Sequence, residues 1–303
     1  MADCCGPKVK RDNRVLVRSA YGRIAKEGGS CCGGKSCQGG SGSNAVAGQI
    51  GYSKEDLKNL PKGANLGLGC GNPGAIAELK PGETVLDLGS GAGIDAFLAA
   101  RKVGPKGKVI GVDMTPDMLE KARANVAAFR KRSGLKNVEF RLGEIEHLPV
   151  ADASVDTIIS NCVINLSSDK PSVWCEVARV LKPGGRMAVS DLALTAPLPA
   201  CLKNSVAALT ACIAGAVTVA ETEKMVRAAG LTGLAMESRP YPVEAVADIS
   251  DPLYRKLVAS LPKGRTFGDY IVSLSIKATK PRGPGGKPKN GGARHRLVHT
   301  GTR

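Results

Sequence analysis

Aromatic residues are scarce in this chain of 303 residues, at 3% for phenylalanine, tryptophan and tyrosine together. This scarcity argues against a platform on which the bases of single-stranded nucleic acid could stack. Histidine is also rare, with His147, His295 and His299 as the complete set. So few histidines argue against a catalytic zinc ion bound by histidines and against a Ser-His-Asp triad.

Long hydrophobic runs are also lacking. The longest uncharged apolar run, 206–220, has 15 residues, which is shorter than the roughly 18–20 of a membrane-spanning helix. The N-terminus shows no apolar segment of the kind that a secretory signal carries. We therefore expect a cytoplasmic protein that has no membrane partner.

The net charge of +16 belongs mainly to the two ends of the chain. Residues 1–50 hold eight Lys/Arg against three Asp/Glu, and residues 281–303 hold six Lys/Arg and no acid. We interpret these ends as solvated segments rather than as a nucleic-acid interface. The sequence predicts four zones: a flexible Cys/Gly-rich arm (1–45) with one helix near 15–25, a core (46–195), a C-terminal extension at the substrate site (196–280) and a disordered basic tail (281–303).

Strand and helix patterns alternate within the core. Strands are predicted at 84–88, 109–112, 138–142, 155–160 and 186–190, and helices at 94–102, 116–133 and 171–181. This alternation predicts an α/β fold with a mainly parallel sheet that helices cover on both faces. Ligands of such sheets bind beyond the carboxyl ends of the strands.

A glycine-rich loop follows the first predicted strand and opens the first predicted core helix. Asp87 precedes it, and the loop itself contains Gly89, Ser90, Gly91 and Gly93. Glycines let a ligand approach the backbone closely, and Asp113, twenty residues after Gly93, can accept hydrogen bonds from ribose hydroxyls. The absence of a following Lys-Ser or Lys-Thr excludes a triphosphate P-loop. Because Asp87 is negative, a cationic nucleoside such as S-adenosylmethionine fits better than a pyrophosphate.

The motifs at 87–93, 111–114 and 181–185 resemble those of class I S-adenosylmethionine-dependent methyltransferases. The resemblance implies a Rossmann-like, seven-stranded sheet and an α+β extension after the core. It also implies roles at the cofactor: Asp113 for the ribose, Met114 against the adenine, and Asn161 for the methionine part. The segment Glu144, Ile145 and Glu146 would flank the adenine.

The substrate is indicated by the cysteines, of which there are ten. The residues after the fourth predicted strand, Ser160-Asn161-Cys162-Val163, include neither the proline nor the aromatic residue that would grip a flipped base. A thiol stands there instead. Cys70, in a glycine-rich loop before the first strand, and Cys212, after the core, can reach the same edge of the sheet. Three soft thiolates favour a soft centre such as trivalent arsenic.

The pattern as a whole resembles the arsenite methyltransferase family through most of residues 20–225. The resemblance implies that Cys70, Cys162 and Cys212 bind As(III) and that an N-terminal cysteine assists. Cys31, Cys32 and Cys37 all compete for that role, and we favour Cys32.

Arsenic(III) carries a lone pair, so it can attack a sulfonium methyl group without a catalytic base. Arsenite and methylarsenite would be the substrates, mono- and dimethylated arsenicals the products, and a trimethylated product a further option. We expect a monomer in which Cys32 and Cys70 form a disulfide that thioredoxin or glutathione reduces. Two alternatives remain open: a methyltransferase acting on carbon of a quinone- or sterol-like molecule, and a non-catalytic, thiol-rich metalloid-binding protein.

Overall fold

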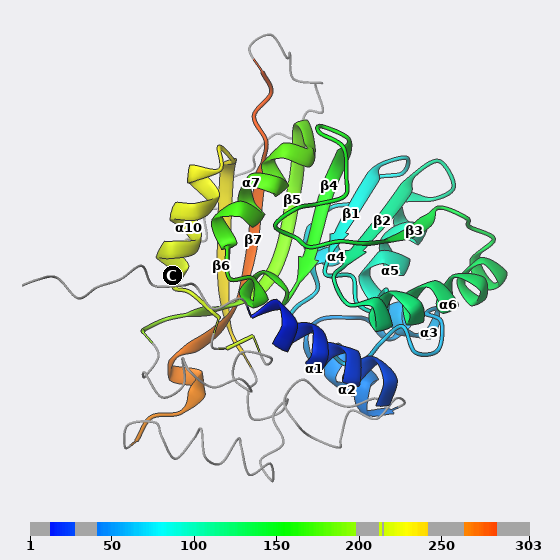
Figure 1. Cartoon of the computed structure of the whole chain (residues 1–303), viewed down its shortest axis with the longest axis horizontal. Helices are drawn as coiled ribbons and strands as arrows, with labels where there is room; N and C mark the ends of the chain where they lie inside the picture. Colours follow the sequence, from blue (N-terminus) through cyan, green and yellow to red (C-terminus); the bar gives the residue numbers. More distant parts are fainter. Residues whose placement is uncertain (1–12, 28–40, 198–211, 214, 242–263, 284–303) are drawn as a thin grey trace, which may run out of the picture.

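Seven strands form one sheet in the order β3-β2-β1-β4-β5-β7-β6 (Figure 1). The computed structural model describes residues 13–27, 41–197, 212–213, 215–241 and 264–283. The strands from β3 to β5 are parallel, and β7 runs antiparallel to both β5 and β6. The predicted mainly parallel, seven-stranded sheet is confirmed. The strands are β1 (Thr84–Leu88), β2 (Lys108–Asp113), β3 (Val138–Leu142), β4 (Val155–Asn161), β5 (Leu181–Leu194), β6 (Thr232–Pro240) and β7 (Ile271–Thr279).

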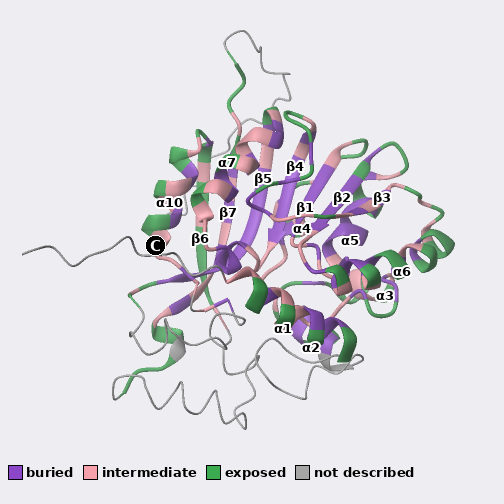
Figure 2. Cartoon of the chain, in the orientation of Figure 1, coloured by how far each residue is buried: buried purple, intermediate pink, exposed green. Residues whose placement is uncertain are grey.

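Helices cover both faces of this sheet. Along β1, Leu86 and Leu88 pack into one apolar cluster and Val85 into a second, because successive side chains of a strand point to opposite faces. Helices α7 and α10 complete the first cluster, and α5 and α6 the second. The central strands are buried (Figure 2). The described helices are α1 (Arg14–Glu27), α2 (Ser41–Gln49), α3 (Lys54–Lys58), α4 (Pro73–Ile76), α5 (Ile94–Val103), α6 (Pro116–Ser133), α7 (Lys170–Val180) and α10 (Val219–Ala228), with short 3₁₀ turns η2 (Ile164–Leu166) and η3 (Phe267–Asp269).

Local sequence signals explain where these helices begin and end. Helix α6 starts with Pro116, whose fixed φ suits the first helical position, and stops at Gly134, which has a φ of 72°. Helix α10 starts with a capping box in which Thr218 and Glu221 bond to each other's backbone N–H. Both helices therefore begin at a recognisable local signal, and α6 also ends at one.

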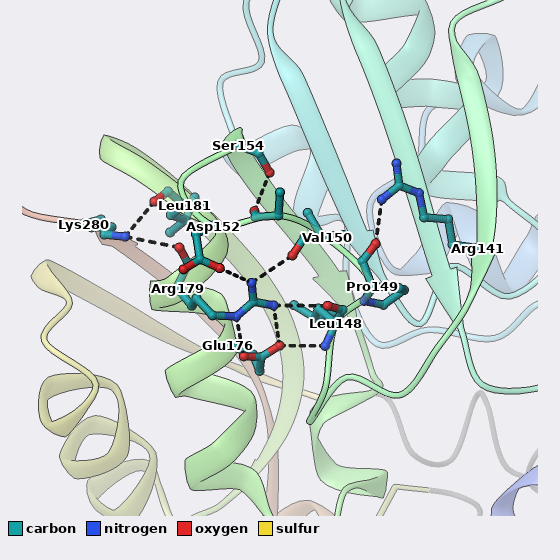
Figure 3. Close-up of polar contacts among 11 residues, drawn as sticks. Arg141, Leu148, Pro149, Val150, Asp152, Ser154, Glu176, Arg179, Leu181 and Lys280 are labelled. Carbon is teal, nitrogen blue, oxygen red and sulfur yellow. Dashed lines mark hydrogen bonds and ion pairs between the residues drawn. The ribbon is translucent and has the colours of Figure 1, made fainter.

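The connection between β3 and β4 is fixed by Arg179 of α7 (Figure 3). Its guanidinium donates to the carbonyl oxygens of Leu148 (3.1 Å) and Val150 (2.9 Å), and it pairs with Asp152 and Glu176. Glu176 in turn accepts a hydrogen bond of 2.7 Å from the backbone N–H of Leu148. The same connection carries the segment 144–146, so Arg179 anchors a part of the chain that was predicted to flank the adenine.

Segments outside the predicted core complete the molecule. Helix α1 lies within the predicted N-terminal arm, and it lies beside the carboxyl ends of the central strands (Figure 1). The predicted C-terminal extension supplies α10, β6 and β7. Among the described residues, no helix is long and apolar enough to cross a bilayer.

Candidate active site

The glycine loop joins β1 to α5 through left-handed backbone. Gly89, Gly91 and Gly93 have φ values of 64°, 51° and 99°, which residues with a Cβ rarely adopt. A Cβ at Gly89 would stand 2.4 Å from Val163, and one at Gly93 would stand 2.7 Å from Phe97. At Gly91, no described atom lies within 4 Å of that position. Packing therefore requires glycine at positions 89 and 93, whereas Gly91 borders open space.

Asp113, at the end of β2, lies beside the glycine loop and is hydrogen-bonded to it. One carboxylate oxygen accepts the N–H of Gly91 at 2.9 Å, and the other accepts the N–H of Thr115 at 2.8 Å. Burial raises the pKa of Asp113, although these two bonds oppose the rise. The residue that was predicted to hold the ribose therefore lies directly against the loop.

Three carboxyl groups, those of Asp87, Asp95 and Asp113, are gathered around this loop. Burial raises the pKa of Asp87 well above its ordinary value, and the charges of Asp95 and Asp113 add to the rise. Burial also raises the pKa of Asp95. Within the described part of the chain, the Oδ2 atom of Asp87 and the hydroxyl of Ser90 are buried without a hydrogen-bond partner. A cationic ligand would offset the negative charge of the carboxyl groups, and its polar groups would supply the missing hydrogen-bond partners. These residues therefore fit S-adenosylmethionine.

The segment 144–146 has contacts that the sequence did not reveal. Glu144 forms ion pairs with Arg14 and Arg18 of α1. Ile145 is buried in the core, and Glu146 accepts a hydrogen bond from the hydroxyl of Ser167. Glu144 thus links α1 to the connection after β3.

Asn161, at the end of β4, is held by hydrogen bonds on both sides of its amide. Its Oδ1 accepts the N–H of Cys70 at 3.1 Å, and its Nδ2 donates to the carbonyl oxygen of Gly71 at 2.8 Å. The same Nδ2 donates to the hydroxyl of Tyr52 at 2.9 Å and lies 3.3 Å from Asp95. The carboxylates of the glycine loop and the loop of Cys70 therefore meet at one side chain.

The structure brings Cys70, Cys162 and Cys212 together. The Sγ atoms of Cys70 and Cys162 lie within 4.8 Å of each other and of a carboxylate oxygen of Asp191. The Sγ of Cys212 donates to the carbonyl oxygen of Cys162 at 3.0 Å. Cys162 follows Asn161 directly, so the thiol group borders the predicted position of the methionine part of the cofactor.

The surroundings of the three thiols are mostly apolar. Cys70 and Cys212 are buried in a cluster with Val17, Leu166 and other apolar side chains, and Met114 packs against that cluster. The interaction with Cys162 and burial raise the pKa of the Cys212 thiol well above its ordinary value. The bond with Cys212 lowers the pKa of Cys162. The contact with Cys70 and burial raise it by more than this, so the pKa of Cys162 lies well above its ordinary value.

Two of these cysteines have strained backbone. The φ values are 57° at Cys162 and 63° at Cys212, both in the left-handed region. A non-glycine residue there costs about 1–3 kcal/mol, and such strain gathers at functional sites. The surrounding packing therefore holds both thiols in positions that an unconstrained chain would avoid.

Several residues at the site were not identified from the sequence. Asp191, directly after the predicted end of the fifth strand, accepts from the backbone N–H groups of Ile164 and Leu192 at 2.9 and 2.8 Å and from the side chain of Asn165 at 2.8 Å. It therefore anchors the chain beside Cys162. Its position at the carboxyl end of a parallel strand was the signal that could have indicated it.

Other predicted residues lie away from the site or outside the described residues. His147 is exposed. Cys31, Cys32 and Cys37 lie outside the described residues, as do Cys4, Cys5 and Cys201.

Comparisons with known proteins agree with this geometry. The family model described as "Methyltransferase domain" matches residues 79–230. Together with the sheet order, the glycine loop and the carboxyl cluster, this match defines the chain as a class I, S-adenosylmethionine-dependent methyltransferase.

Three relatives define the family further. The chain is 46% identical over 89% of its length to the arsenite methyltransferase of Halobacterium salinarum, and it covers 67% of that protein. It is 37% identical over 55% of its length to the arsenite methyltransferase of Mus musculus, of which it covers 45%. An arsenic (III) S-adenosylmethionine methyltransferase from Chlamydomonas reinhardtii superposes with a TM-score of 0.56, at 35% identity, over 80% of this chain and 74% of that one. The chain belongs to the arsenite methyltransferase family.

Proposed function

We propose that this chain transfers a methyl group from S-adenosylmethionine to As(III) held by the thiols of Cys70, Cys162 and Cys212. The observation that carries the proposal is the convergence of three thiols, from stretches far apart in the sequence, beside the end of β4. The glycine loop follows the neighbouring strand, β1, so donor and acceptor would meet at one edge of the sheet.

The three thiols bind arsenite by exchange. Each thiol proton combines with one hydroxide of As(OH)₃, so three As–S bonds form, three water molecules leave and no net charge enters the site. A neutral product suits the apolar cluster around Cys70 and Cys212, where an unpaired charge would be costly. Thiol sulfur is also the ligand type that soft centres prefer.

The methyl transfer needs alignment more than acid–base chemistry. S-adenosylmethionine supplies an electrophilic methyl group on a sulfonium. The arsenic lone pair attacks that methyl group in line, and the arsenic has no proton to lose. Asn161 and Cys162 are adjacent in sequence, so the residue predicted to face the methionine part positions a thiol ligand as well. Holding two reactants in such a geometry can lower a barrier by about 7–11 kcal/mol in favourable cases.

The arsenic product is formally pentavalent and has to be reduced before another round. We infer that Cys32 and Cys70 supply two electrons and become a disulfide, which thioredoxin or glutathione then reduces. Methylarsenite would re-enter the site, giving a dimethylated and then a trimethylated product. A reducing compartment such as the cytoplasm would keep the thiols free. One chain suffices, since all three thiols belong to it.

Replacement of single cysteines tests the ligand set. Cys162→Ser and Cys212→Ser should each abolish methylation of arsenite, measured by mass spectrometry of arsenic products formed with labelled S-adenosylmethionine. Cofactor affinity should stay unchanged in isothermal titration calorimetry. Cys175→Ser is the matched control, because Cys175 is a free, exposed thiol on α7. Wild-type rates in either of the first two variants would refute the trithiolate site.

The reductive role of Cys32 needs its own variant. Cys32→Ser should impair methylation of arsenite more than methylation of methylarsenite. Full activity of this variant on arsenite would show that Cys32 is not the electron donor. Arsenite should also raise the melting temperature of the wild type but not of Cys162→Ser, a result that an enzyme acting on a quinone- or sterol-like carbon would not give.

A further inference from the structure

Three other stretches of the chain meet at the amide of Asn161. Cys70 comes from the loop before β1, Asp95 from the first turn of α5, and Tyr52 from the turn between α2 and α3. Tyr52 and Cys70 both precede the matched methyltransferase domain, which begins at residue 79. The hydroxyl of Tyr52 donates to Asp95 at 2.8 Å and accepts from Asn161 at 2.9 Å.

These bonds fix the orientation of the Asn161 amide. Its Nδ2 has two hydrogens, which are directed at the Tyr52 hydroxyl and the Gly71 carbonyl, so its Oδ1 is left facing the N–H of Cys70. Tyr52 is itself held by the apolar cluster on one face of the sheet, where its side chain packs with Leu60 and Ala64. The hydroxyl is therefore a fixed point against which the amide rests.

The Cys70 loop has little freedom to adjust if that amide turns. The backbone of Gly69, at a φ of 153°, lies so close that an added Cβ would stand 3.0 Å from the Nδ2 of Asn161. On its other side, the carbonyl oxygen of Cys70 accepts the hydroxyl of Ser273 in β7 at 2.7 Å. A rotation of the amide would thus displace the Cys70 backbone between two close neighbours.

We propose that Tyr52 is a positioning residue: through Asp95 and the Asn161 amide, its hydroxyl holds the Cys70 loop so that the third thiol reaches As(III). This inference rests on the proposed function, because it takes Cys70 as an arsenic ligand. It adds a residue that precedes the matched methyltransferase domain. Tyr52 acts on arsenic binding only through Cys70.

A double-mutant cycle on the full chain tests this dependence without a turnover assay. The dissociation constant of As(III) is measured by isothermal titration calorimetry, with no S-adenosylmethionine, for the wild type, Tyr52→Phe, Cys70→Ser and the double variant. Tyr52→Phe should weaken binding about tenfold, which corresponds to about 1.4 kcal/mol. In the Cys70→Ser background the same change should have less than about a twofold effect, since residues in one network are non-additive.

The control is Ser133→Ala, which removes a hydroxyl that donates to the carbonyl oxygen of Phe129 at 2.8 Å, at the end of α6 and on the opposite edge of the sheet. It should bind As(III) like the wild type, and urea unfolding should show that Tyr52→Phe is folded under the assay conditions. Equal effects of Tyr52→Phe in both backgrounds would overturn the positioning role while leaving the ligand set intact. A Cys70→Ser variant that binds As(III) like the wild type would overturn the ligand set and this inference with it.

Discussion

The substitution Gly91→Ala adds one methyl group, whose effect on the free energy of unfolding and whose effect on cofactor affinity can be measured separately. The φ of 51° at Gly91 is left-handed, and no described atom lies within 4 Å of the position that a Cβ would take. Gly91→Ala should therefore cost the protein only the backbone penalty, about 1–2 kcal/mol. For a chain of this size the melting temperature should fall by about 2–8 °C.

Cofactor binding should suffer more. The open space beside Gly91 adjoins Asp87 and Asp113, where the carboxyl cluster fits a cationic nucleoside. A methyl group forced into a close-packed contact costs about 1–3 kcal/mol, so the affinity for S-adenosylmethionine should fall about 5- to 150-fold.

Gly134→Ala is the matched control. Gly134 has a φ of 72° and an equally open Cβ position, but it ends α6 at the opposite edge of the sheet. Both variants should lose similar stability in urea unfolding, and only Gly91→Ala should lose affinity in calorimetry with S-adenosylmethionine. If the two variants bound the cofactor equally well, the space beside Gly91 would not be the cofactor site.

Two further predictions concern stability. Burial raises the pKa of Asp191 to about 6, against about 3.9 in an unfolded chain. Between these pH values the folded state binds more protons than the unfolded state does. The contribution of Asp191 to the free energy of unfolding therefore falls by about 3 kcal/mol as the pH rises from about 4 to about 6. Asp191→Asn should remove that slope in urea titrations at a series of pH values, and an unchanged slope would contradict the assignment. Arg186 makes a bidentate ion pair with Glu83, at 2.7 and 2.9 Å, and also binds the carbonyl oxygen of Ala77. Arg186→Met should lower the free energy of unfolding by about 2–3 kcal/mol, because it leaves the half-buried carboxylate of Glu83 without its ion pair. Adding Glu83→Gln should restore part of this loss. A double variant that is no more stable than Arg186→Met would argue against this cause.

The sequence was most informative where local signals and the sheet agree. The predicted helix at 116–133 and the strands at 84–88 and 138–142 have the bounds that the structure shows. Proline and glycine at the helix ends, and short apolar runs bounded by turns, act over a few residues and so can be read without the fold. The strand predicted at 186–190 extends over Leu181–Leu194. After residue 190 the extension is paired with β7, more than 70 residues later, in a ladder that no local pattern shows.

The site followed the same division. Asp87 and the glycines lie in one motif and Asp113 in a second motif twenty residues later, and the structure places both around one loop. Tyr52 could not have been identified, because a tyrosine in a turn between two short helices has no signal that points to Asn161. The ion pairs of Glu144 with α1 were also missed, since they join residues more than 120 positions apart. Long-range partners of this kind become visible only when the fold places them together.

The position of β7 has a consequence for biosynthesis. This strand is the last along the described part of the chain, yet it lies between β5 and β6 and its Ser273 holds the loop of Cys70. A nascent polypeptide that has emerged only as far as α10 can build the nucleotide half of the sheet, since domains begin to fold from the N-terminus during translation. The proposed As(III) site, in which Ser273 holds the loop of Cys70, would therefore be completed only after β7 has left the ribosome.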